Sequence, residues 1–128
     1  MTGRRGFLKA AAVGVAATAV PHAMARGADD RRVVVGVIGT GGMGTSHVRQ
    51  LAQRADVELA YVSDADSNRA TNAAKAVEAA GGKAPQAVRD FRQMLDDRRV
   101  EAVFIATPDH WHAPAAILAL QAGKLVYV

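Results

Sequence analysis

A glycine-rich hexamer that directly follows a run of β-branched residues constrains this chain more than any other feature. The run is Val33–Ile38, and the hexamer that follows reads Gly39-Thr40-Gly41-Gly42-Met43-Gly44, a G-x-G-x-x-G pattern. A continuous β-branched run is typical of a strand buried on both faces of a parallel sheet. A helical pattern comes next, so the glycines are expected to form a tight turn between strand and helix.

The same turn predicts a site for a dinucleotide. Gly39 permits the tight turn, Gly41 lets the backbone approach a pyrophosphate, and Gly44 allows close contact between helix and strand. The phosphates would lie on the free N–H groups at the positive end of the helix. Context therefore supports a pattern that would be weak evidence if it stood alone.

Asp64 completes the predicted nucleotide site. It lies 20 residues after Gly44, at the end of a second predicted strand. An acid at this spacing is expected to accept hydrogen bonds from the adenosine ribose. Its charge would repel a 2′-phosphate, which favours NAD over NADP. Arg69 is close enough in the sequence to weaken that repulsion, so NADP stays open. A solvated place on the helix surface is the alternative for Arg69.

Strands and helices alternate along the rest of the chain. After residues 33–38 we expect strands at residues 57–63, 85–88, 102–106 and 125–128. The first helix is predicted from its apolar positions Gly44, Val48, Leu51, Ala52 and Ala55. The second, capped by Asp66 or Ser67 and closed by Gly81-Gly82, is predicted from Ala70, Ala73, Ala74, Val77 and Ala80. A short helix is expected from Asp90 to Leu95, and a fourth to Ala122 before Gly123, with Pro114 in its first turn. This alternation predicts an α/β fold with a doubly wound parallel sheet.

The segment Thr107-Pro108-Asp109-His110-Trp111-His112 is a second candidate part of the site. It follows the predicted strand at residues 102–106, and doubly wound sheets bind ligands at the carboxyl ends of their strands. Two histidines near an aspartate also suggest a metal, but a third ligand is not evident, so we predict none. His47, one turn into the first helix, either faces the cofactor or is a half-exposed helix residue.

Three stretches of the chain resemble the Gfo/Idh/MocA oxidoreductases, which include glucose–fructose oxidoreductase and inositol dehydrogenase. Residues 35–44 with His47 are similar to the start of that family. Thr107-Pro108 with His112 matches its T-P-x-x-x-H motif, and residues 122–128 match its A-G-K-x-V-x-V strand. The resemblance covers residues 32–128 and implies a Rossmann domain that binds NAD(P). The cofactor-binding residues that it implies are Gly39, Thr40, Gly41, Gly42, Met43, Gly44, Asp64, Thr107, Pro108 and His112.

The resemblance also implies what is missing from this chain. In the family an E-K-P sequence follows, whose lysine is catalytic or orients the substrate. A second α/β domain then supplies the catalytic histidine and the substrate site. We therefore expect an incomplete Rossmann sheet, truncated at the fifth strand, with no catalytic residue of its own. A lysine is expected just beyond Val128, and the chain alone is expected to be inactive.

Residues 1–25 have the three parts of an export signal. A charged start is followed by the weakly apolar run Ala10–Val20 and by small residues before a cleavage point after Ala25. Arg4-Arg5 ahead of Phe7 resembles a twin-arginine signal, although Gly3 stands where a serine or threonine is usual. An ordinary secretion signal or an amphipathic helix is the alternative. We expect the twin-arginine translocase to carry the folded protein to the periplasm or otherwise out of the cell, with residues 26–31 as a linker.

Composition excludes several other classes of protein. Half of the 128 residues are apolar and 22% are charged, as in an ordinary globular domain. Residues 1–25 carry +3 of the formal charge of +4, so the remainder has no basic excess that would indicate nucleic-acid binding. The absence of cysteine excludes thiol nucleophiles, cysteine-ligated zinc and iron–sulfur clusters.

These observations lead to one functional hypothesis with two alternatives. The first is an exported NAD(P)-dependent oxidoreductase that acts on a sugar or cyclic polyol and assembles as a homo-oligomer when full length. The second is a redox-neutral, NAD-dependent glycosidase of the same fold. The third is a protein that binds a dinucleotide or a sugar without catalysis, because fold alone does not determine function.

Overall fold

The computed structural model describes residues 30–128 of the chain. The predicted signal peptide, its cleavage point and most of the predicted linker lie outside these residues. Within residues 30–128, none of the helices has the length and apolar character needed to cross a membrane.

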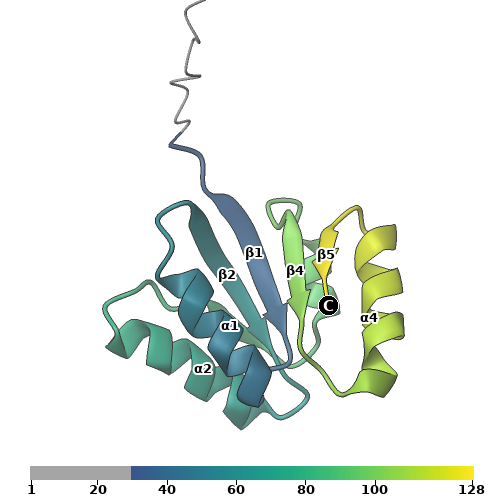
Figure 1. Ribbon diagram of the computed structural model, residues 1–128, viewed down its shortest axis with the longest axis horizontal. Coiled ribbons are helices and arrows are strands. Elements are labelled where there is room, and N and C mark those ends of the chain that lie inside the picture. The colour runs from purple at the N-terminus through teal and green to yellow at the C-terminus, as the bar shows by residue number, and fades with distance from the viewer. Residues whose placement is uncertain (1–29) are drawn as a thin grey trace, which may run out of the picture.

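Five parallel strands form a single sheet in the order β3-β2-β1-β4-β5 (Figure 1). The strands are β1 (Val33–Ile38), β2 (Val57–Ser63), β3 (Gln86–Val88), β4 (Ala102–Ile105) and β5 (Leu125–Tyr127). The helices are α1 (Gly42–Ala52), α2 (Ser67–Ala79), α3 (Arg92–Asp96) and α4 (Asp109–Gln121). The predicted α/β fold with a doubly wound parallel sheet is confirmed. The strand order reverses between β1 and β4, which makes their carboxyl ends the switch point of the sheet.

Alternate residues of the central strand serve two separate cores. Val35 and Val37 of β1 are buried in a cluster with side chains of α1 and α2. Ile38 belongs to the other cluster, together with side chains of α3 and α4. The helices therefore cover opposite faces of the sheet in pairs, which explains why β1 is apolar along almost its whole length.

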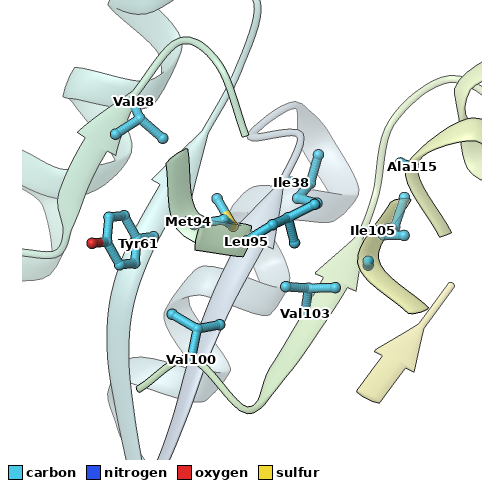
Figure 2. Packing of buried hydrophobic residues seen from close by; sticks show 10 residues of the cluster. Ile38, Tyr61, Val88, Met94, Leu95, Val100, Val103, Ile105 and Ala115 are labelled. Carbon is cyan, nitrogen blue, oxygen red and sulfur yellow. The ribbon is translucent and has the colours of Figure 1, made fainter. Parts of the chain in front are cut away.

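A glycine in β1 makes room for the side chain that fills the second core. Met94 of α3 is fully buried, and Figure 2 shows it beside Leu95, among side chains that come from the sheet. A Cβ atom on Gly36 would lie 2.6 Å from the Met94 sulfur. A larger residue at position 36 would therefore force the Met94 side chain to move within a close-packed core.

Several predicted boundaries were wrong by a few residues. Ala55 is exposed beyond the end of α1, and Ala80 is exposed beyond the end of α2, so neither extends the apolar face of its helix. Asp90 precedes α3 rather than opening it, and its carboxylate accepts a hydrogen bond from the N–H of Arg92 at 3.0 Å. The predicted strands at residues 85–88, 102–106 and 125–128 are each one residue shorter.

The position predicted for Pro114 was also wrong. It is the sixth residue of α4 and not part of the first turn, because the helix begins immediately after Pro108. A proline at this depth removes one hydrogen bond from the helix. The early start has its own cause: Asp109 places a negative charge at the positive end of the helix dipole. The start at Asp109 brings the residues after β4 to the carboxyl edge of the sheet.

The turn between β1 and α1 is a contact of backbone on backbone. Gly39 has a φ of +91°, and a Cβ atom there would lie 2.7 Å from the carbonyl oxygen of Ala106. A Cβ atom on Gly44 would lie only 1.8 Å from the carbonyl oxygen of Gly39. The two glycines therefore hold the start of α1 directly against the ends of β1 and β4, as the motif predicts.

We expect Gly44→Ala to destabilise the fold by about 3 kcal/mol or more, because its methyl group would collide with backbone that cannot move aside. Gly42→Ala is the matched control: it adds the same methyl group at the start of the same helix, where no atom lies within 4 Å. Alanine is also the better helix former, so this control should be neutral or slightly stabilising. Urea unfolding followed by circular dichroism measures both changes. Equal stability of the two variants would contradict the packing role of Gly44.

Candidate functional site

A cavity of about 1000 Å³ opens at the carboxyl ends of β1, β2 and β4. It spans the switch point of the sheet, where doubly wound folds bind their ligands. Four segments line it: the glycine turn, the residues after β2, the residues before and within α3, and the segment from Ala106 into α4. Its volume is at the upper end of the range for sites that hold small molecules and cofactors.

The structure brings half of the predicted cofactor-binding residues together in this cavity. Those that line it are Gly39, Gly41, Asp64, Thr107 and Pro108. Thr40 and Gly44 are buried behind the turn, whereas Gly42 and Met43 are exposed at the start of α1. His112 is half-buried and lies outside the lining.

The start of α1 has the donors that a pyrophosphate requires. Within residues 30–128, the N–H groups of Gly42, Met43 and Gly44 make no hydrogen bond, and no side chain caps the helix. Gly41, the residue before the helix, borders the cavity, and a Cβ atom there would meet no protein atom within 4 Å. The open space at Gly41 and the unpaired N–H groups beside it fit an anionic group at a helix N-terminus.

Asp64 binds the glycine turn as well as lining the cavity. Its Oδ2 accepts hydrogen bonds from the Thr40 N–H at 2.9 Å and from the Thr40 hydroxyl at 3.1 Å. Its Oδ1 accepts a third, from the N–H of Asp66 at 2.9 Å. A carboxylate offers about four acceptor positions, so one remains on Oδ1 for a ligand. The acid expected to bind ribose thus also ties the end of β2 to the turn after β1.

Thr107 is held by its carbonyl but not by its hydroxyl. The ring Nε2 of His112 lies 2.7 Å from the Thr107 carbonyl oxygen, which places this histidine in a role internal to the loop. The Thr107 Oγ1 is buried and has no partner in the described part of the chain. A buried hydroxyl without a partner is costly, and Thr107 borders the cavity, so this hydroxyl is a candidate contact for a polar group of a ligand.

Two arginines that flank Asp64 also line the cavity. From the sequence, Arg69 was expected only to weaken the repulsion of a 2′-phosphate, and Arg89 was not predicted. Arg69 lines the cavity from α2, with its Nε 3.8 Å from an Asp66 carboxylate oxygen. Arg89 follows β3 and donates from Nε to the carbonyl oxygen of Ala65 at 3.1 Å. Only the pairing of β2 with β3 brings Arg89 beside the residues after β2, so the spacing along the sequence could not reveal it.

Two further groups line the cavity: an ion pair that follows Arg89, and apolar side chains of α4. The Arg92 guanidinium donates three hydrogen bonds to the Asp90 carboxylate and holds the pKa of that carboxyl below its ordinary value. Trp111, which is half exposed, and Leu118 line the cavity from α4. Apolar side chains beside a few polar groups are typical of a cofactor site.

His47 lies away from this cavity. Its ring packs against Phe104 and Tyr127, with ring centroids 5.7 Å apart in both pairs. The structure thus resolves the two predicted alternatives in favour of a packed, half-buried helix residue. No group of three potential metal ligands is found among residues 30–128, and His110 and His112 form no such group.

Comparison with known proteins agrees with the geometry of this cavity. Residues 33–128 match the model of the oxidoreductase family with an NAD-binding Rossmann fold, GFO_IDH_MocA. The chain belongs to the Gfo/Idh/MocA oxidoreductase family. Its Rossmann domain is of the NAD-binding kind that the family model describes, and two solved neighbours with this fold are complexes with NAD or NAD(H).

Relatives of this Gfo/Idh/MocA domain include two kinds of enzyme. A glycosyl hydrolase family 109 protein of Stenotrophomonas maltophilia (strain K279a) is 37% identical over 96% of this chain and 28% of its own length. Inositol 2-dehydrogenase 1 of Saccharopolyspora erythraea is 41% identical over 73% of this chain and 27% of its own. The myo-inositol dehydrogenase of Lactobacillus casei, solved with NAD(H) and myo-inositol, is 29% identical with a TM-score of 0.68. The match covers 74% of this chain and 27% of that protein's chain. The chain therefore spans little more than a quarter of each of these relatives.

We expect Gly41→Ala to weaken NAD binding at least about tenfold while leaving the free energy of unfolding nearly unchanged. The methyl group would occupy the space that fits a pyrophosphate, and it would touch no protein atom. Trp111 is the only tryptophan and borders the cavity, so quenching of its fluorescence can report the titration. Gly42→Ala, at an exposed position outside the lining, should weaken binding less. Equal affinities for the two variants would contradict the placement of the phosphates at Gly41.

Proposed function

We propose that this domain is the nucleotide-binding part of an exported NAD-dependent oxidoreductase that acts on a sugar or cyclic polyol. The observation that carries the proposal is the junction of Gly41, Asp64 and Thr107 in one cavity at the switch point. Gly41 offers space beside unpaired donors for the phosphates, and Asp64 offers an acceptor for the ribose. Thr107 adds a buried hydroxyl that has no partner among residues 30–128.

The residues of this chain bind and orient the cofactor. The N–H groups at the start of α1 hold the pyrophosphate, and Asp64 accepts from the adenosine ribose. Trp111 and Leu118 present apolar surface to the cavity from α4. When bound, NAD supplies the capacity to accept a hydride from a carbon that carries a hydroxyl group. A lysine beyond Val128, implied by the family resemblance, would receive the hydroxyl proton.

A cyclic polyol is the substrate class best supported by the relatives. The Saccharopolyspora protein is an inositol 2-dehydrogenase, and the Lactobacillus structure contains myo-inositol. The match to the Stenotrophomonas glycosyl hydrolase family 109 protein favours a second candidate. It covers 96% of the chain and so reaches into the predicted signal peptide, whereas the inositol dehydrogenase match covers 73% of the chain. That candidate is a glycosidase in which bound NAD is reduced and reoxidised within each turnover.

Assembly into a homo-oligomer is part of the proposal. β5 is an edge strand, and the exposed fractions of Leu125 and Tyr127 are 71% and 57%. An apolar edge strand of this kind favours association with another chain or with another part of the same chain.

The reaction distinguishes the two enzyme candidates. In a protein that joins this domain to the further length present in its relatives, we expect a cyclic polyol to reduce added NAD, with a rise in absorbance at 340 nm. A redox-neutral glycosidase would instead release p-nitrophenol from a nitrophenyl glycoside without net formation of NADH. Tight binding of NAD with neither reaction, over a panel of sugars and polyols, would favour a non-enzymatic binding protein.

We expect the domain to bind NAD more tightly than NADP because Asp64 offers a negative acceptor to the ribose. Asp64→Ala should weaken NAD binding by about 1–3 kcal/mol, the cost of losing a hydrogen bond to a charged group. Part of this loss would come from the turn, which Asp64 also holds. Titration of both cofactors against Trp111 fluorescence measures the preference. Equal affinities in the parent protein would contradict it.

Export through the twin-arginine translocase is proposed from residues 1–25 alone. Arg4→Lys with Arg5→Lys should block export although the net charge is unchanged, because a receptor reads the arginine pair. Cell fractionation and immunoblotting measure the outcome. Arg26→Lys is the matched control, since it makes the same exchange beyond the predicted cleavage point. Normal export of the double variant would indicate a general secretion signal instead.

A further inference from the structure

Thr40 lies inside the glycine motif but does not line the cavity. Only 5% of the residue is exposed. Both its N–H and its hydroxyl donate to the same oxygen of Asp64, at 2.9 and 3.1 Å. The side chain of Thr40 therefore lies behind the carboxylate that borders the cavity.

These two bonds leave the Asp64 carboxylate little freedom to rotate. Oδ2 has two acceptor positions, and Thr40 fills both. The N–H of Asp66 holds Oδ1 at 2.9 Å, so the carboxylate is fixed at both oxygens. One acceptor position on Oδ1 remains free, and it is the only one that a ligand can use while the other bonds persist.

We propose that Thr40 is a positioning residue for cofactor selection. Its hydroxyl holds Asp64 so that the free position on Oδ1 meets the 2′-hydroxyl of the adenosine ribose. This inference rests on the proposed preference for NAD. Selection then depends on a buried side chain that touches no cofactor atom, as well as on the acid itself.

The fixed carboxylate matters because positive charges lie close to it. Arg69 and Arg89 both line the cavity on the side of Asp64. Arg69 is 63% exposed in its side chain and lies 3.8 Å from Asp66, so its guanidinium can reach other anions. A carboxylate that is free to turn away would leave these cations to a 2′-phosphate. Immobilising Asp64 therefore keeps a negative charge where NADP would place its phosphate.

A variant without the Thr40 hydroxyl tests the positioning role of Thr40 separately from the role of Asp64. Thr40→Val keeps the shape of the side chain and the N–H bond but loses the second bond to Oδ2. We expect the Kd for NAD to rise three- to tenfold, the value of one hydrogen bond, while the Kd for NADP stays the same or falls. Thr40→Ser keeps a hydroxyl and should restore the ratio of the two constants to within about twofold of the parent.

Thr45→Val is the matched control for general loosening of the turn. The Thr45 hydroxyl donates to the carbonyl oxygen of Thr40 at 3.0 Å, on the same turn, and makes no hydrogen bond to Asp64. Its removal should leave the NAD-to-NADP ratio unchanged. In an Asp64→Asn background, Thr40→Val should no longer alter the ratio, because the two residues act on selection as one unit.

The test is titration of each folded variant of the full chain with NAD and NADP, followed by Trp111 fluorescence. Should Thr40→Val fail to fold, Thr40→Ala removes the same hydroxyl with less volume and carries the same expectation. If the variant without the hydroxyl keeps the parent protein's preference for NAD over NADP, the role of Thr40 is overturned, but that of Asp64 is not. An equal shift in Thr45→Val would do the same. Equal affinities of the parent for both cofactors would instead overturn the proposed NAD preference.

Discussion

The structure depends on the contact between the two outer glycines of the motif. The Cα of Gly44 lies so close to the carbonyl of Gly39 that no side chain fits between them, and Gly39 is pressed in turn against the backbone of Ala106. This contact fixes where α1 begins relative to the ends of β1 and β4. The cavity, the unpaired N–H groups and the loop after β4 all take their positions from it.

Asp64 connects this turn to the next strand. In holding Thr40, its carboxylate ties the end of β2 to the residues after β1, and it still has an acceptor position facing the site. With the proposed preference for NAD, structure and ligand selection share one side chain. A substitution there changes both, which is why the hydroxyl of Thr40, acting on selection through Asp64, separates the two effects better than removal of the acid does.

The sequence could place those residues of the cavity lining that depend on neighbours along the chain. Gly39, Gly41 and Asp64 could be placed because a strand, a turn and a helix follow each other at characteristic spacings. The spacing could not show that Arg89 lies beside Ala65, since pairing of β2 with β3 creates that contact. Nor could it choose between the two environments of His47, which depend on the rings of Phe104 and Tyr127.

By itself, the sequence determined the α/β class, the parallel sheet, the position of the glycine turn and the acid that follows it. These features depend on local periodicity and on backbone conformations that only glycine adopts easily. The tertiary structure alone decided which side chains face the cavity and which hold its walls: Thr40 behind Asp64, His112 on the Thr107 carbonyl, and Pro114 deep in α4. Those assignments depend on distances between segments far apart in the chain, and packing sets such distances only when the sheet and helices come together.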